Sequence, residues 1–160
     1  MTGPQRCRAV IAAPFGALEL VASGSHLIDV EIKTEMRDMI PPATPVLLEA
    51  ARQLNAYFEA PDWRFSLPLF VAGTPFQQIV WQAMCAIPAG SVKTYGQLAA
   101  ELHSGPRAVA GACRANHFPI IIPCHRVVSV KGIGGYGGAV SGAVLNIKRQ
   151  LLQHEGYEFP

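Results

Sequence analysis

The stretch "TYGQLAAELHSGPRAVAGACRAN", residues 94–116, decides the fold of the second half of the chain. It predicts a short helix from about Tyr95, a turn at His103–Gly105, and a second helix opened by Pro106, because proline suits the first position of a helix. Two short helices joined by a glycine-containing turn form a helix-turn-helix unit, which can place its second helix against DNA.

The second predicted helix carries two arginines on one face. Arg107, Gly111 and Arg114 fall at i, i+4 and i+7, so they lie on the same side. The rest of the helix is nearly all Ala and Gly, with Val109 and Cys113 on another side for the core. A face with two cations and no bulk between them can approach a phosphate backbone closely. An ordinary helix pair with two solvated arginines fits the same pattern, so both interpretations stay open here.

Composition and charge narrow the class of protein. The chain has 160 residues, of which 50% are hydrophobic and 15% charged, a globular rather than a disordered composition. Residues 1–70 carry six Lys and Arg against eight Asp and Glu, whereas residues 71–160 carry seven against three. If the chain contacts a polyanion, we therefore expect the contact in its second half.

The sequence indicates neither membrane insertion nor secretion. No apolar run approaches the ~20 residues that a membrane helix needs, and the N-terminal residues do not have the pattern of a signal peptide. The four cysteines (Cys7, Cys85, Cys113 and Cys124) show no CxxC pairing, so we expect free thiols in a reducing cytoplasm.

The first half predicts a small antiparallel sheet with a helix. "RCRAVIAA", "GALELVA" and "HLIDVEI" are short β-rich runs separated by turn signals. "TPVLLEAARQLNAYFEA" is an amphipathic helix with Thr44 as its N-cap. A proline-rich connector follows, and from Pro75 a further helix is predicted. Its expected apolar stripe is Phe76, Ile79, Val80, Ala83 and Ile87.

The predicted fold class is therefore α+β, in two domains. Residues 1–70 form the small sheet with its helix, and residues 71–160 form a mainly helical domain with the helix-turn-helix.

The stretch "IIIPCHRVV", residues 120–128, places a thiol beside an imidazole within an apolar run. A thiolate is the nucleophilic form of cysteine, and a nearby base is needed to produce it at neutral pH. Neighbours on a strand point to opposite faces, so contact between Cys124 and His125 requires a turn or a bridging water. Glu155 offers a carboxylate to orient the imidazole. A cysteine buried simply as a small apolar residue remains the alternative.

With these motifs, the chain resembles the O6-alkylguanine-DNA alkyltransferases, also called methylated-DNA–protein-cysteine methyltransferases. The resemblance spans about residues 73–157 and rests on motifs in a fixed order. These are "GTPFQQIVW", "IPAGSVKTYGQLA", "RAVAGACRAN", "IIIPCHRVV", "GGYGG" and "KRQLLQHEG". Residues 1–70 are similar to the family in layout rather than in motif.

The resemblance implies DNA repair by direct alkyl transfer, and a role for each matching residue. Cys124 would attack the alkyl carbon on guanine O6, in a single irreversible turnover per chain. His125 would deprotonate Cys124 through a bridging water, and Glu155 would hold that histidine. Tyr95 would protonate the guanine ring nitrogen N3. Asn116 would brace the turn that carries Cys124.

The resemblance also implies the mode of DNA binding. The recognition helix would enter the minor groove, and Arg107 would fill the gap left by the flipped nucleotide. The residues implied in DNA binding are Arg107, Tyr95, Ala108, Gly111 and Arg114. The residues implied around the extruded base are Val127, Tyr136, Gly137 and Gly138.

The implied partner is double-stranded DNA that contains O6-alkylguanine, bound by a chain that is monomeric when free; its self-association on DNA is left open. No cofactor is implied. Some relatives bind zinc in the N-terminal domain, but here only Cys7 and His26 are candidate ligands, and two ligands do not complete a tetrahedral site. We therefore expect no metal. The expected location is the cytoplasm of a prokaryotic-type cell, at the nucleoid.

Two departures from the family pattern affect the site. His117 follows Asn116 where the family usually has proline, which concerns the rigidity of that turn. The segment Ala139–Ile147 is about four residues longer than the family pattern, which concerns the shape of one pocket wall and the alkyl groups it accepts.

Three other functions are alternatives to DNA repair by alkyl transfer. A non-catalytic lesion-binding relative would lack the acceptor cysteine, whereas Cys124 is present. A transcription regulator that uses only the helix-turn-helix would leave the PCHRV motif without a purpose. The third alternative is a hydrolase that uses Cys124 and His125 as nucleophile and base.

Overall fold

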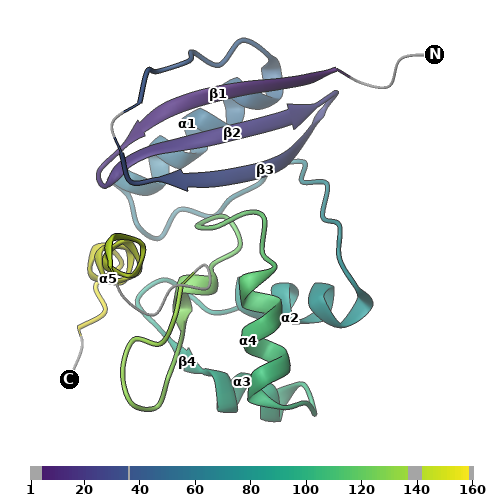
Figure 1. The fold of residues 1–160 in the computed structure, drawn as a ribbon, viewed down its shortest axis with the longest axis vertical. Coiled ribbons are helices and arrows are strands. Elements are labelled where there is room, and N and C mark those ends of the chain that lie inside the picture. Colours follow the sequence, from purple (N-terminus) through teal and green to yellow (C-terminus); the bar gives the residue numbers. More distant parts are fainter. Residues whose placement is uncertain (1–4, 36, 137–141, 159–160) are drawn as a thin grey trace. The chain divides into compact units, whose positions relative to one another are not determined.

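The structure is a computed structural model that describes residues 5–35, 37–136 and 142–158 (Figure 1). The chain forms two compact units, Met1–Val71 and Ala72–Pro160. The first combines strands with a helix and the second is mainly helical, so the predicted α+β class is confirmed. In the described residues, no helix is both long and apolar enough to span a bilayer.

The first unit is a three-stranded antiparallel sheet with one helix. The strands β1 (Arg6–Ala13), β2 (Gly16–Ser23) and β3 (His26–Lys33) pair in the order β1-β2-β3. The helix α1 (Pro45–Glu59) contacts all three strands and lies across one face of the sheet (Figure 1). Thr44 caps α1 through a side-chain oxygen that accepts from the backbone N–H of Leu47, as predicted.

The second unit contains four α-helices among its described residues. These are α2 (Pro75–Cys85), α3 (Tyr95–Glu101), α4 (Pro106–Arg114) and α5 (Ala143–His154). The predicted starts of α3 and α4 are confirmed, and the two helices pack against each other as a helix-turn-helix. His103, in the turn between them, has a φ of 53°.

The inner face of α2 differs from the predicted stripe. Val80, Trp81 and Met84 are its buried residues, whereas the side chain of Ile79 is 50% exposed. The indole Nε1–H of Trp81 donates a 2.8 Å hydrogen bond to the backbone carbonyl of Ala112 on α4. Val80 and Ile87 of the predicted stripe are buried, as predicted. Because the large indole takes the position against α4, the rest of the buried face is shifted toward Trp81 and Met84.

Two short strands bring distant segments of the second unit together. Strand β4 (Lys93–Thr94) pairs in parallel with β5 (Val127–Val128). Thr94 is also the N-cap of α3, in a reciprocal capping box with Gln97, so Tyr95 begins a helix directly after the strand. The 3₁₀ turn η1 (Cys124–Arg126) leads directly into β5. Tyr95 and the Cys124 segment are therefore placed by the same strand pair.

Candidate alkyl-acceptor site

The side chain of Asn116 closes the loop that leads to Cys124. Its Nδ2 donates to the carbonyl oxygen of Ile122 at 2.9 Å, and its Oδ1 accepts from the backbone N–H of Phe118 at 2.8 Å. The N–H of Ile122 also bonds to the carbonyl of Phe118 at 2.8 Å. One carboxamide thus satisfies a donor and an acceptor of a tightly folded backbone segment.

Ile120, inside this loop, has an unusual backbone conformation. Its φ is 76°, in the left-handed region that β-branched residues rarely adopt, and its side chain is buried. Such a conformation costs of the order of 1–3 kcal/mol and persists only where the surroundings enforce it. Here the hydrogen bonds of Asn116 hold the loop at both ends, so the approach to Cys124 is fixed at an energetic cost.

Cys124 is the first residue of η1 and is only 7% exposed. Burial raises the pKa of its thiol, and the neighbouring Asn116 side chain and the positive charge of Lys148 oppose that rise. The resting thiol is therefore neutral. Since the thiolate is the nucleophile, a base must remove the proton before the sulfur can react.

His125 provides a base that is held on one side. Its Nε2 lies 2.7 Å from Oε2 of Glu155, and neither side chain has any exposed surface. Burial lowers the pKa of His125 more than Glu155 raises it, so the imidazole is neutral. The proton on Nε2 then faces the carboxylate, and Nδ1 carries the lone pair. Nδ1 is buried and has no hydrogen-bond partner among the described residues.

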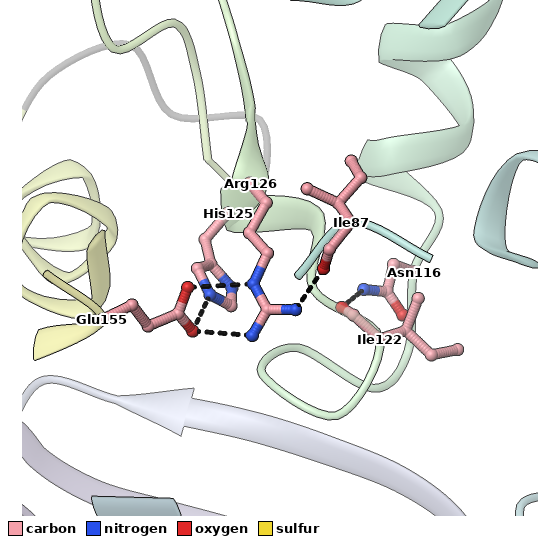
Figure 2. Close-up of polar contacts among 6 residues, drawn as sticks. All are labelled: Ile87, Asn116, Ile122, His125, Arg126 and Glu155. Carbon is pink, nitrogen blue, oxygen red and sulfur yellow. Dashed lines mark hydrogen bonds and ion pairs between the residues drawn. The ribbon is translucent and has the colours of Figure 1, made fainter. Parts of the chain in front are cut away.

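Arg126, to which the sequence analysis assigned no role, completes this cluster (Figure 2). Its Nε donates to Oε1 of Glu155 at 2.9 Å and its Nη2 to Oε2 at 3.0 Å. Its Nη1 donates to the carbonyl oxygen of Ile87 at 2.6 Å. The arginine in PCHRV was the available signal, but only the folded chain brings it to the same carboxylate as His125.

Lys148 on α5 is a second residue that the sequence analysis missed. Its side chain is fully buried, and its Nζ donates to the carbonyl oxygens of Val127 and Gly135, both at 2.7 Å. Burial lowers its pKa to about 8, although the thiols of Cys124 and Cys113 act in the opposite direction. Lys148 therefore joins α5 to β5 and to the segment that contains the GGYGG motif.

Tyr95 lies against the same segment. Its hydroxyl is 3.4 Å from the carbonyl oxygen of Gly135, and the Nζ of Lys148 is 5.8 Å from the centre of its ring. Burial raises the pKa of Tyr95 to about 12, which keeps the phenol protonated. Gly134 has a φ of 76°, and a Cβ there would lie 3.0 Å from the tyrosine ring. A glycine is required at this close approach.

Helix α4 carries four of the five residues predicted to bind DNA; the fifth, Tyr95, begins α3. Arg107, Ala108 and Arg114 are exposed. A Cβ added to Gly111 would meet no atom of the described residues within 4 Å, so no contact among these residues requires a glycine there. Glycine within a helix costs about 1 kcal/mol relative to alanine. The glycine leaves open space at this position on the outer side of α4, where another molecule could approach the helix backbone.

Of the four residues expected around the extruded base, two are described by the structure and two are not. Val127 and Tyr136 are buried. Gly137 and Gly138 lie outside the described residues, as do residues 139–141 of the longer segment. In the part of the chain that the structure describes, no group of three or more His, Cys, Asp or Glu side chains could hold a metal ion.

A helix-turn-helix in the same unit as a buried cysteine, which a buried His–Glu pair follows, defines the class of site, and comparison with known proteins identifies the family. The model for the DNA binding domain of 6-O-methylguanine DNA methyltransferase matches residues 75–157. The model for the ribonuclease-like domain of the same proteins matches residues 7–71, where the motif resemblance was weakest. The chain belongs to the 6-O-methylguanine DNA methyltransferase family, as predicted.

Individual relatives agree. The methylated-DNA–protein-cysteine methyltransferase of Mycobacterium leprae is 36% identical over 159 residues, which cover 95% of this chain and 93% of that protein. The regulatory protein ada of Salmonella typhimurium is 44% identical over 117 residues, 71% of this chain but only 33% of that longer protein. The solved structure of Mycobacterium tuberculosis OGT in complex with DNA has a TM-score of 0.77 and 34% identity, over 93% of this chain and 92% of that one.

Proposed function

We propose that this protein repairs DNA by transferring the alkyl group of O6-alkylguanine to Cys124, once per chain and irreversibly. The observation that carries the proposal is the cluster in which Cys124 opens a turn, His125 follows it, and Glu155 binds the imidazole at 2.7 Å. A buried nucleophile beside an oriented base is the arrangement that nucleophilic catalysis requires. The family of the chain, and relatives named for methyl transfer to a protein cysteine, support the same reaction.

The proposed reaction moves one alkyl group from guanine O6 to the sulfur of Cys124. His125 accepts the thiol proton of Cys124 at Nδ1, through a bridging water. The sulfur then bonds to the alkyl carbon while the bond from that carbon to O6 breaks, and its electron pair stays on guanine. Tyr95, whose raised pKa of about 12 keeps its phenol protonated, donates a proton to N3 of the leaving base. The imidazolium of His125 then returns a proton, through solvent, to the phenolate of Tyr95, so both side chains regain their starting forms. Over the whole reaction the thiol loses one proton and guanine gains one.

The DNA would be bound through α4 in the minor groove. The smooth face around Gly111 allows the backbone of the helix to approach the duplex, and Arg107 would occupy the space of the extruded nucleotide. Extrusion costs a few kcal/mol, and less for a weakened pair. The solved relative in complex with DNA supports DNA as the partner.

We assign DNA contact and alkyl transfer to residues 71–160 and a structural role to residues 1–70. The free protein would be a monomer in the cytoplasm, where prokaryotic DNA lies. Fluorescence microscopy of a tagged chain would test the location, and nucleoid exclusion would contradict it.

Transfer is tested with duplex DNA that carries a radiolabelled O6-methyl group. We expect label on the protein, at most one equivalent per chain, because a thioether is a very poor leaving group. Cys124→Ser should acquire no label while still binding DNA. Turnover beyond one equivalent would contradict the proposal. Label that stays on bound DNA would favour a lesion-binding protein instead.

A further inference from the structure

Glu155 is shared between two side chains of the same short turn. Its Oε2 lies 2.7 Å from Nε2 of His125 and 3.0 Å from Nη2 of Arg126, while Oε1 accepts from Nε of Arg126 at 2.9 Å. The remaining guanidinium nitrogen, Nη1, is fixed to the carbonyl oxygen of Ile87 just beyond α2. Figure 2 shows the guanidinium between the carboxylate and this carbonyl.

A planar guanidinium that binds both oxygens of a carboxylate fixes its rotation as well as its position. His125 contacts only one oxygen of Glu155, so this contact by itself does not oppose rotation of the carboxylate about its last bond. Arg126 prevents this rotation, and Ile87 in turn prevents movement of Arg126. The direction from which Oε2 meets the imidazole is therefore set by Arg126.

We propose that Arg126 is a positioning residue for alkyl transfer, which orients Glu155 so that His125 keeps its proton on Nε2 and presents Nδ1 to the thiol of Cys124. This inference rests on the proposed function. It adds Arg126 as a fourth residue to Cys124, His125 and Glu155, in a role that requires no contact with the reacting sulfur. Its neighbour in sequence, His125, is the base, and Arg126 fixes the orientation of the carboxylate that holds this base.

The charged groups that face His125 predict a pH signature. Glu155, at the end of α5, raises the pKa of the imidazole, whereas Arg126 in the same turn and Lys148 on α5 lower it. Loss of the Arg126 charge therefore raises the pKa of His125. Since only the neutral imidazole accepts the thiol proton, the acid limb of the rate profile should move to higher pH.

The test compares Arg126→Met and Arg126→Lys with the wild type, in single-turnover transfer from labelled duplex DNA between pH 5.5 and 9. Arg126→Met should slow transfer by about tenfold or more at neutral pH, as loss of an orienting partner typically does. Its deficit should be larger at pH 6 than at pH 8. Arg126→Lys keeps the charge but cannot grip both oxygens and the Ile87 carbonyl, so it should be slower with an unshifted acid limb.

A matched control is present in α1. Arg52 grips Glu49 through two hydrogen bonds on an exposed surface, so Arg52→Met removes the same kind of pair away from the acceptor cysteine. It should transfer at the wild-type rate. A double-mutant cycle with Glu155→Gln adds a second readout, because residues that act as one unit are non-additive. Arg126→Met should then add little to the loss already caused by Glu155→Gln.

The outcomes separate the inference from the proposed function. If the wild type acquires no label, the proposed function fails. If the wild type reacts and Arg126→Lys matches it at every pH, the positioning role is overturned. A deficit of Arg126→Met that is independent of pH and fully additive with Glu155→Gln would overturn it as well. Should Arg126→Met fail to fold by circular dichroism, Arg126→Lys and its cycle with Glu155→Gln decide the question.

Discussion

The carboxamide nitrogen of Asn116 lies 2.9 Å from the carbonyl oxygen of Ile122, two residues before Cys124. The segment that follows α4 is thereby tied directly to the backbone that leads to Cys124. A change in the position of either segment must be transmitted to the other or break this bond.

Asn116→Ala should therefore destabilise the protein and slow transfer together. It leaves the N–H of Phe118 and the carbonyl of Ile122 without a side-chain partner, at a cost of about 1–3 kcal/mol. The melting temperature should fall by several degrees, at roughly 2–4 °C per kcal/mol. Asn55→Ala, at an exposed position of α1, is the matched control and should change neither quantity. An Asn116→Ala protein with wild-type melting and transfer would refute the coupling.

Arg107→Ala should impair repair of duplex DNA much more than reaction with the free base O6-benzylguanine. The free base has no stack to leave, so there is no gap for the arginine to fill. Extrusion costs a few kcal/mol, and each 1.4 kcal/mol is about tenfold in rate. Single-turnover rates with both substrates give the measurement, with the exposed Arg64→Ala as control. Equal losses with the two substrates would remove Arg107 from the flipping role.

Gly111→Ala should stabilise the free protein and weaken its binding to DNA. In the part of the chain that the structure describes, the added methyl meets no atom within 4 Å, and alanine favours a helix over glycine by about 1 kcal/mol. Chemical denaturation measures the first effect, and fluorescence anisotropy with unmodified duplex measures the second. Tighter or unchanged DNA binding would show that the glycine does not serve close approach.

The pH dependence of stability should reveal the buried charge of Lys148. Its pKa is lowered from 10.5 to about 8 in the folded protein, so between these values the unfolded chain binds more protons. Stability from this group therefore rises with pH across that window, by about 3 kcal/mol in all, and the cost of the charge is fully present below pH 8. The free energy of unfolding of the wild type minus that of Lys148→Met should rise from pH 8 to 10.5. A flat difference would contradict the lowered pKa.

Local signals made much of the fold predictable. Thr44 begins α1, and Pro106 begins α4, because caps and N-terminal prolines act within one turn of a helix. The inner face of α2 was predicted only in part, because Trp81 occupies a buried position through a bond to α4, 31 residues away. A periodicity within one helix contains no information about such a partner.

The site was predictable only in part for the same reason. The motif resemblance pointed to Cys124, His125 and Glu155, and the structure brings His125 and Glu155 into contact. Lys148, in a polar stretch of α5, gives no local sign that it is buried. Its partners are carbonyl oxygens at Val127 and Gly135, and backbone atoms from two separate segments leave no trace in residue types.

The 7% exposure of Cys124 has a consequence for how long the protein remains useful. A chain that reacts once is consumed by any electrophile or oxidant that reaches its sulfur first. A thiol that is covered and neutral at rest reacts slowly with small reagents in the surrounding solution, because these attack exposed thiolates. The burial that makes a base necessary thus also keeps the thiol of Cys124 unreacted until the protein meets a damaged nucleotide.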